Sequence, residues 1–180
     1  MVNHNVNHKN IESINSLKNK EKIRILFVCL GNICRSPAAE AILKDKLEKR
    51  GITENEVLVD SAGIGDWHEG QLPDRRMRSH GADRGYDISS RARQVKQADL
   101  DRFDIIIGMD HENVADLRRL AVSHEQSKKI MCMADFFSNG TTNDTVPDPY
   151  YGGDKGFELV LDLLEDSCEN IIDKLVAGKL

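Results

Sequence analysis

The chain has 180 residues, a net charge of −5, 39% hydrophobic residues and 31% charged residues. This length fits one domain with a buried core, and the composition is that of a soluble globular protein instead of a disordered one. The acidic balance gives no indication of non-specific nucleic-acid binding, and no apolar run approaches the roughly 20 residues that cross a bilayer. We therefore expect neither a nucleic-acid partner nor a membrane partner.

The first 22 residues are polar and rich in Asn, Lys and His. They contain neither the apolar segment of a signal peptide nor the arginines of an organellar transit peptide. The chain has four cysteines, which are too few for a secreted disulfide scaffold. We predict a flexible extension at residues 1–22, one domain at residues 23–180, and a cytoplasmic location under reducing conditions.

Strands and helices alternate along the predicted domain. The apolar run Ile23–Val28 is typical of a strand buried on both faces. Ser36 is a good N-cap and Pro37 suits the first turn of the helix that follows, which is predicted to reach Arg50 and to end at Gly51. Further strands are predicted at residues 57–59, 103–107 and 129–133, further helices at 74–81, 112–120 and 157–176, and turn-rich loops at 60–63 and 138–153.

This alternation predicts βαβ units, and the fold class is α/β: a single-domain open sheet of four parallel strands flanked by helices. Ligands of such sheets bind beyond the carboxyl ends of the strands. The loop after the first strand is therefore the first place to look for a site. It reads Cys29-Leu30-Gly31-Asn32-Ile33-Cys34-Arg35-Ser36-Pro37.

Each residue type in this loop suits a bound phosphate. A curled loop entering a helix N-terminus presents backbone N–H groups to an anion, and Gly31 and Asn32 tolerate the left-handed backbone that such a curl requires. Arg35 can bind two phosphate oxygens, and with the helix N-terminus and the Ser36 hydroxyl it favours the thiolate of Cys29. A buried structural cysteine would not require these neighbours. The sequence predicts a phosphate-binding loop after the first strand, with Cys29 as nucleophile.

Transfer of a phosphoryl group to a cysteine requires a proton for the departing oxygen. Asp148 is a candidate donor because a proline on each side restricts its backbone. Tyr150 and Tyr151 place aromatic surface next to it. The alternative is an ordinary surface turn, because the sequence does not show that this loop lies near Cys29.

The sequence C-L-G-N-I-C-R-S-P after an apolar strand, with D-P-Y-Y-G late in the chain, resembles the low-molecular-weight protein tyrosine phosphatases over residues 23 to about 176. The resemblance implies that Cys29 forms a cysteinyl-phosphate intermediate and that Arg35 clamps the phosphate. Asp148 would act as general acid in the first step and as the base that activates water in the second. The expected substrates are phosphotyrosine proteins and small aryl phosphates, with acid phosphatase activity as a further expectation. We expect no cofactor, no metal, and a monomer or weak dimer.

The resemblance also implies supporting roles around the loop. Asn32 matches a left-handed loop residue held by a hydrogen-bond network that includes Ser61, and the Ser36 hydroxyl steadies the thiolate. Ser90 stands where some relatives carry a histidine in that network, and its hydroxyl can still donate and accept hydrogen bonds. Cys34 matches a cysteine that forms a reversible disulfide with the nucleophile and protects it from over-oxidation. The aromatic walls that receive a phosphotyrosine ring are Trp67, Tyr150 and Tyr151.

Three alternatives use the same type of loop. Thioredoxin-coupled arsenate reductases need further cysteines to relay a disulfide, but Cys132 in a predicted strand and Cys168 in the last helix are expected to be packing residues. Protein-arginine phosphatases tend to carry a hydroxyl residue where this chain has Ile33, whose apolar side chain suits an aromatic ring. A phosphate-binding module without turnover would not need Cys29. The acid at Asp148 favours hydrolysis of phosphotyrosine.

Overall fold

The structure is a computed structural model that describes residues 22–180. The extension predicted at residues 1–22 lies, apart from Lys22, outside the described residues. No helix in the described part is long and apolar enough to cross a membrane. The elements in chain order are β1 (Ile23–Cys29), α2 (Arg35–Lys49), β2 (Val57–Gly63), α3 (Arg75–Asp83), α4 (Gln97–Arg102), β3 (Ile105–Gly108), α5 (His111–Leu120), α6 (His124–Ser127), β4 (Ile130–Cys132), the 3₁₀ helix η1 (Met133–Phe136) and α7 (Asp154–Val176).

The four strands form one parallel sheet in the order β2-β1-β3-β4, which confirms the predicted fold class. β1 and β3 are the inner strands, and both are almost entirely buried. Their buried parts, residues 25–29 of β1 and all of β3, are continuous apolar runs without alternation because both faces are covered. The register pairs Cys29 with Gly63 and Val28 with Gly108, so β1, β2 and β3 end at one edge of the sheet.

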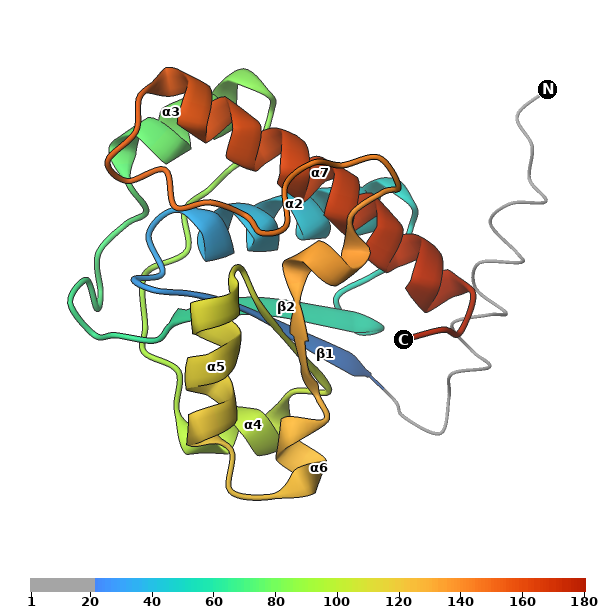
Figure 1. Cartoon of the computed structure of the whole chain (residues 1–180). Helices are drawn as coiled ribbons and strands as arrows, with labels where there is room; N and C mark the ends of the chain where they lie inside the picture. Colours follow the sequence, from blue (N-terminus) through green and yellow to red (C-terminus); the bar gives the residue numbers. More distant parts are fainter. Residues whose placement is uncertain (1–21) are drawn as a thin grey trace, which may run out of the picture.

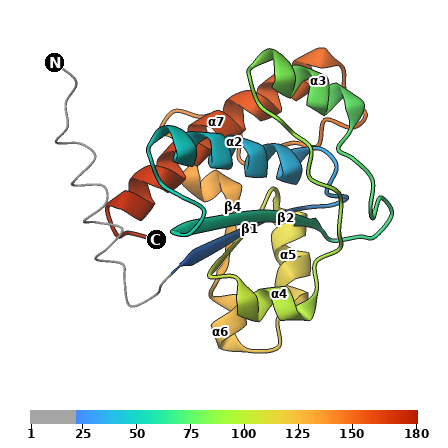
Figure 2. The same ribbon diagram turned by 180° about the vertical axis from the view of Figure 1, so that it is seen from behind.

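Helices cover both faces of the sheet. Figures 1 and 2 show α2 and α7 on one face, and α4, α5 and α6 on the other, with α3 beside the beginning of α7. Alternate residues of β1 supply the two cores: Ile25 and Phe27 pack on the side of α2 and α7, and Leu26 and Val28 pack on the opposite side. The carboxyl end of β1 is therefore held rigidly between two packed layers.

Two local predictions were wrong for the same reason, which is that a tertiary contact outweighed a local preference. β2 runs to Gly63, where a turn-rich loop was predicted, because residues 60–63 pair with the inner strand β1. The N-cap of α2 is Cys34, which makes no side-chain cap. Ser36 instead lies inside the helix, where its hydroxyl faces Cys29.

The remaining differences concern short elements and boundaries. α3 runs two residues past Gly81, and α7 begins three residues before Phe157. The helices α4 and α6, with six and four residues, were not predicted. Segments of this length are too short to show a helical period of apolar residues.

Candidate active site

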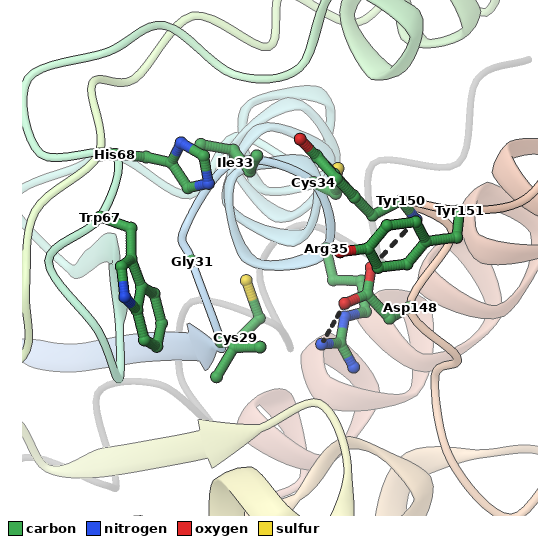
Figure 3. A pocket seen from close by; sticks show the side chains of 11 residues that line it. Cys29, Gly31, Ile33, Cys34, Arg35, Trp67, His68, Asp148, Tyr150 and Tyr151 are labelled. Atoms are coloured by element: carbon green, nitrogen blue, oxygen red, sulfur yellow. Dashed lines mark hydrogen bonds and ion pairs between the residues drawn. The ribbon is translucent and has the colours of Figure 1, made fainter.

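The predicted phosphate loop and the predicted acid meet in one pocket at the carboxyl end of β1 (Figure 3). The pocket is built from three segments that are far apart in sequence: the phosphate loop (residues 29–35), the loop after β2, and the acid loop (residues 146–152). The structure thus brings Asp148 to the same pocket as Cys29, which the sequence alone did not show. The lining residues are Cys29, Leu30, Gly31, Ile33, Cys34, Arg35, Trp67, His68, Asp148, Tyr150 and Tyr151.

The backbone of the phosphate loop forms the floor of the pocket. Asn32 has a φ of 56° and is the only non-glycine residue with positive φ among residues 22–180. Gly31 was expected to share the left-handed conformation but does not adopt it. The amide N–H groups of residues 30–34 donate to no acceptor within the described chain, so they form a nest of donors for an anion at the N-terminus of α2.

A chain of buried hydrogen bonds holds the loop from behind. Cys29 Sγ lies 3.0 Å from Ser36 Oγ, which accepts a bond of 2.8 Å from Asn32 Nδ2. Asn32 Nδ2 also donates to Ser61 Oγ at 2.9 Å, and Ser61 Oγ donates to Glu40 Oε1 at 2.7 Å. All five side chains are buried. The network expected around Asn32 and Ser61 is therefore present, and it ends on a carboxylate.

Two partners in this network were missed by the sequence reasoning. Glu40 is a buried acidic residue of α2, and its second oxygen accepts from Lys44 Nζ at 2.7 Å. The backbone N–H of Arg93 donates to Asn32 Oδ1 at 3.0 Å. Ser90, which was expected in the network, makes none of these hydrogen bonds. The available signal for Glu40 was its place four residues after Ser36, on the same face of the helix.

Arg35 lies almost completely buried beside the phosphate loop, with 2% of its surface exposed. Its Nη1 donates to Asp110 Oδ2 at 2.7 Å and to the Val146 carbonyl at 3.0 Å, and its Nη2 lies 3.6 Å from Asp148 Oδ2. Burial alone would lower the pKa of Arg35, but Cys29, the hydrogen bond to Asp110 and the charge of Asp148 together raise it. The guanidinium therefore stays charged although it is almost completely buried.

Asp110 is a further site residue that the sequence reasoning missed. It is the N-cap of α5, where its Oδ1 accepts from the backbone N–H of Asn113 at 2.8 Å, while its Oδ2 orients Arg35. The available signal was an acidic residue two positions after the end of β3, on the side of the sheet where the phosphate loop lies.

Unlike the buried Arg35, Asp148 is partly open to solvent: 42% of its side chain is exposed. Its Oδ1 accepts from the backbone N–H of Tyr150 at 3.0 Å, which forms a turn within the acid loop. The loop is anchored upstream by Val146, whose N–H donates to the Met109 carbonyl at 3.0 Å. Figure 3 shows the carboxyl group beside the guanidinium of Arg35. Because the Asp148 side chain is partly exposed, it can exchange a proton with a bound ester or with water.

Aromatic side chains stand on both sides of Cys29 (Figure 3). Trp67 is 64% exposed and lies on one side, where its ring covers Gly65 so closely that a Cβ there would be 1.9 Å from it. On the other side the rings of Tyr150 and Tyr151 meet edge to face, with centroids 4.9 Å apart. The sequence reasoning did not select His68, which also lines the pocket.

The four cysteines are free thiols with different environments. Cys34 lines the pocket, but burial and the nearby charges of Asp74, Cys29 and Asp148 raise its pKa, so it is a neutral thiol. Cys132 and Cys168 lie in β4 and α7 as predicted; both are buried, burial raises the pKa of each, and neither lines the pocket.

The parallel sheet with a cysteine-centred anion loop at the end of β1 defines a phosphatase-type α/β protein. Residues 24–179 match the family model described as low molecular weight phosphotyrosine protein phosphatase. The chain is 44% identical to the low molecular weight protein-tyrosine-phosphatase YfkJ of Bacillus subtilis over 158 residues, which are 87% of this chain and 98% of that protein. The chain belongs to the low-molecular-weight protein tyrosine phosphatase family, which confirms the resemblance.

Solved structures agree with this assignment. A crystal structure of the protein tyrosine phosphatase from Entamoeba histolytica, with Hepes in the active site, is 48% identical and has a TM-score of 0.84, covering 88% of this chain and 99% of that one. The crystal structure of a Drosophila arginine phosphatase is 32% identical with a TM-score of 0.77, covering 84% and 96%. The fold is thus shared by phosphatases with different named substrates.

Proposed function

We propose that this protein hydrolyses phosphotyrosine, and small aryl phosphates, through a cysteinyl-phosphate intermediate. The observation that carries the proposal is the convergence of the Cys29 thiol, the buried guanidinium of Arg35 and the half-exposed carboxyl group of Asp148 on one pocket. Each of the three groups suits one requirement of phosphoryl transfer: a nucleophile, a fixed positive charge and a proton donor.

In the first half-reaction the phosphate oxygens bind the free N–H groups of the phosphate loop and the guanidinium of Arg35. The Cys29 sulfur attacks phosphorus as a thiolate, which the Ser36 hydroxyl stabilises by donating across the 3.0 Å contact. A P–S bond forms as the P–O bond to the aryl group breaks. Asp148, in its protonated form, gives its proton to the departing phenolate oxygen.

In the second half-reaction the same groups act in reverse. The carboxylate of Asp148 takes a proton from a water molecule, and the water oxygen attacks phosphorus as the P–S bond breaks. Inorganic phosphate leaves and Cys29 returns to its thiolate form. Arg35 stabilises the charge on the transferring group in both steps, and its contacts to Asp110 and Val146 hold it in place for this purpose.

An aryl ester fits the pocket because its ring would pass between Trp67 and Tyr150 as the phosphate reaches the floor. Ile33 adds an apolar surface, where a hydroxyl residue would suit a guanidinium substrate. Phosphoarginine is the second candidate, because one solved relative is named an arginine phosphatase. Arsenate reduction is less favoured, because Cys132 and Cys168 are buried away from the pocket.

Turnover of p-nitrophenyl phosphate and of phosphotyrosine, phosphoserine and phosphoarginine peptides tests the proposal. We expect phosphotyrosine to be the best peptide substrate. Cys29→Ser should abolish turnover, and Asp148→Ala should reduce it by about 10² to 10⁴-fold, less for good leaving groups. Full activity of Cys29→Ser would overturn the mechanism, and preferred turnover of phosphoarginine would overturn the substrate.

We also propose that Cys34 protects the nucleophile by forming a reversible disulfide with Cys29. The proposal is supported by the position of both residues in the phosphate loop and by the free state of both thiols. Peroxide treatment should inactivate the native protein, and dithiothreitol should then restore its activity. Cys34→Ser should lose activity irreversibly under the same treatment, and equal recovery of both proteins would exclude the disulfide.

A further inference from the structure

The turn that begins α3 joins the phosphate loop to the acid loop. The backbone N–H of Asp74 donates to the carbonyl of Ile33 in the phosphate loop at 2.7 Å. Two residues later, Arg76 Nη2 donates to the carbonyl of Tyr150 in the acid loop at 2.8 Å. The two halves of the pocket, more than 100 residues apart in sequence, are thus connected through one short turn.

The guanidinium of Arg76 is itself held firmly. Asp74 is the N-cap of α3 and accepts from the backbone N–H of Arg76 at 2.9 Å. The same carboxylate accepts from Arg76 Nε at 3.1 Å and Nη2 at 3.0 Å, which makes a two-pronged ion pair. The guanidinium carbon also lies 4.8 Å from the ring centre of Phe157 and 5.6 Å from that of Tyr150. Its direction toward the Tyr150 carbonyl is therefore fixed.

Tyr150 connects Arg76 to Asp148 through two backbone hydrogen bonds. Its carbonyl accepts from Arg76, and its N–H donates to Asp148 Oδ1 at 3.0 Å. Burial does not fix the carboxyl group of Asp148, because 42% of its side chain is exposed. The upstream end of the acid loop is held at Val146. Downstream of Asp148, where Pro149 is buried, the bond from Arg76 is the hydrogen bond that a side chain outside the loop donates to the loop before α7 begins in the described chain.

We propose that Arg76 is a positioning residue that holds Tyr150, and through it the carboxyl group of Asp148, where that group can reach the leaving oxygen. This rests on the proposed role of Asp148 as general acid. Arg76 does not line the pocket and reaches a bound ester only through Tyr150. A displaced Tyr150 ring would lower kcat/KM for every aryl ester alike, whereas a displaced Asp148 would lower it only for an ester whose leaving oxygen needs a proton. Since 44% of its side chain is exposed, its ion pair adds little to stability, and variants should remain folded.

The test is the dependence of kcat/KM on the leaving group. We would compare 2,4-dinitrophenyl phosphate, whose phenolate departs without a proton, with phenyl phosphate, whose phenolate needs one. Arg76→Ala should lower kcat/KM about 10-fold for phenyl phosphate and less than about 2-fold for the dinitrophenyl ester. An equal loss for both esters, or no loss, would overturn the positioning role.

Arg75→Ala is the matched control, because Arg75 is exposed on the same turn and makes none of these contacts; it should behave like the native protein. Arg76→Lys keeps the charge but not the planar fork, so its leaving-group dependence should lie between those of native and Arg76→Ala. Arg76→Lys also serves as the test if Arg76→Ala proves unstable to urea. If Arg76→Lys has the same kcat/KM as the native protein with both esters, the proposal is overturned.

A double variant separates the proposal from the function on which it rests. If Arg76 acts only through Asp148, adding Arg76→Ala to Asp148→Ala should lower kcat/KM for phenyl phosphate no further. An additional 10-fold loss would show that Arg76 acts by another route. If instead Asp148→Ala itself shows no leaving-group dependence, the general-acid role fails, which is a different result from failure at Arg76 alone.

Discussion

The phosphate loop and the acid loop face each other across one pocket, but they are held in different ways. The phosphate loop is buried, and side chains from α2 and β2 hydrogen-bond behind it. The acid loop is exposed over Asp148 and Tyr151 and is tethered at its two ends. The difference suits the two tasks, because an anion site works best when rigid, whereas a carboxyl group that gives and takes protons needs access to water.

Among the residues that hold the two loops in place, the largest effect should come from Asp110, on which both loops depend through Arg35. Asp110→Ala leaves the guanidinium buried without its closest anion, which should reduce the free energy of unfolding by about 3–5 kcal/mol. Activity should fall about 10²-fold as the clamp loses its orientation. Urea unfolding and kcat/KM for phosphotyrosine measure the two effects.

Asp110→Asn separates the clamp from the helix cap, since asparagine also caps helices well. It should unfold more easily than the native protein but less easily than Asp110→Ala, while losing most of the activity. Asp116→Ala, on the exposed side of α5, should change neither quantity by much. A fully active Asp110→Ala would show that Arg35 keeps its orientation without this carboxylate.

The next effect concerns the support behind the phosphate loop. Glu40→Ala removes the acceptor for the Ser61 hydroxyl in a buried site, which should cost about 1–3 kcal/mol of unfolding free energy. Glu40→Gln keeps an acceptor oxygen and should cost less. Glu48→Ala, exposed on the same helix, is the control. If Glu40→Ala is as stable and active as native, the loop holds its shape without the network.

Asp110 and Glu40 also show which features of the site could not be predicted from the sequence. The strand β1 and the phosphate loop were predicted because they are contiguous, and one residue type after another suits a local structure. Asp110 and Glu40 were missed because their partners, Arg35 and Ser61, lie 75 and 21 positions away. Their local signals, a place shortly after β3 and a place one helical turn after Ser36, do not identify those partners. The parallel pairing of β1 with β3 brings Asp110 near Arg35, and the packing of α2 against β2 brings Glu40 near Ser61.

For the acid loop, the local turn was predicted but its place beside Cys29 was not, because the turn depends on neighbouring residues and the place depends on distant ones. Its two prolines and its aspartate indicated a stiff turn with an aimed carboxyl group, and the turn is present with Asp148 bonded to Tyr150. That it meets Cys29 depends on the packing of α7 and on contacts at Val146 and Arg76, which no local pattern encodes.

A smaller effect should appear on the aromatic side of the pocket. A Cβ at residue 65 would overlap the ring of Trp67, and because that ring is mostly exposed, it should swing away at little cost in stability. Gly65→Ala should lower kcat/KM for phosphotyrosine about 5-fold, the equivalent of roughly 1 kcal/mol of ring contact. The inhibition constant of inorganic phosphate should not change.

Gly153→Ala is the control for this substitution, since nothing lies within 4 Å of the added carbon and the backbone φ is −88°. An unchanged kcat/KM for phosphotyrosine in Gly65→Ala would mean that Trp67 does not contact the ring. A change in the inhibition constant of phosphate would mean that the substitution had reached the phosphate loop instead.

The smallest effect should be a pH dependence on the acid-loop side, where His80 of α3 meets the first turns of α7. Its Nδ1 lies 2.6 Å from Glu158 Oε1 and its Nε2 3.2 Å from Asp154 Oδ1, and its ring stacks on Phe157. The hydrogen bond to Glu158, more than any other contact, raises the pKa of His80 above its ordinary value of 6.5.

Because the folded pKa is raised, the stabilisation by His80 is complete below the unfolded pKa and is lost as the pH rises through the folded one. His80→Gln should therefore lower the free energy of unfolding by up to about 1 kcal/mol near pH 6 and by less near pH 9, as measured by urea unfolding. His124→Gln, exposed on α6, should show no such trend. An equal loss at both pH values would mean that the ring stabilises α7 by stacking on Phe157 and not by its charge.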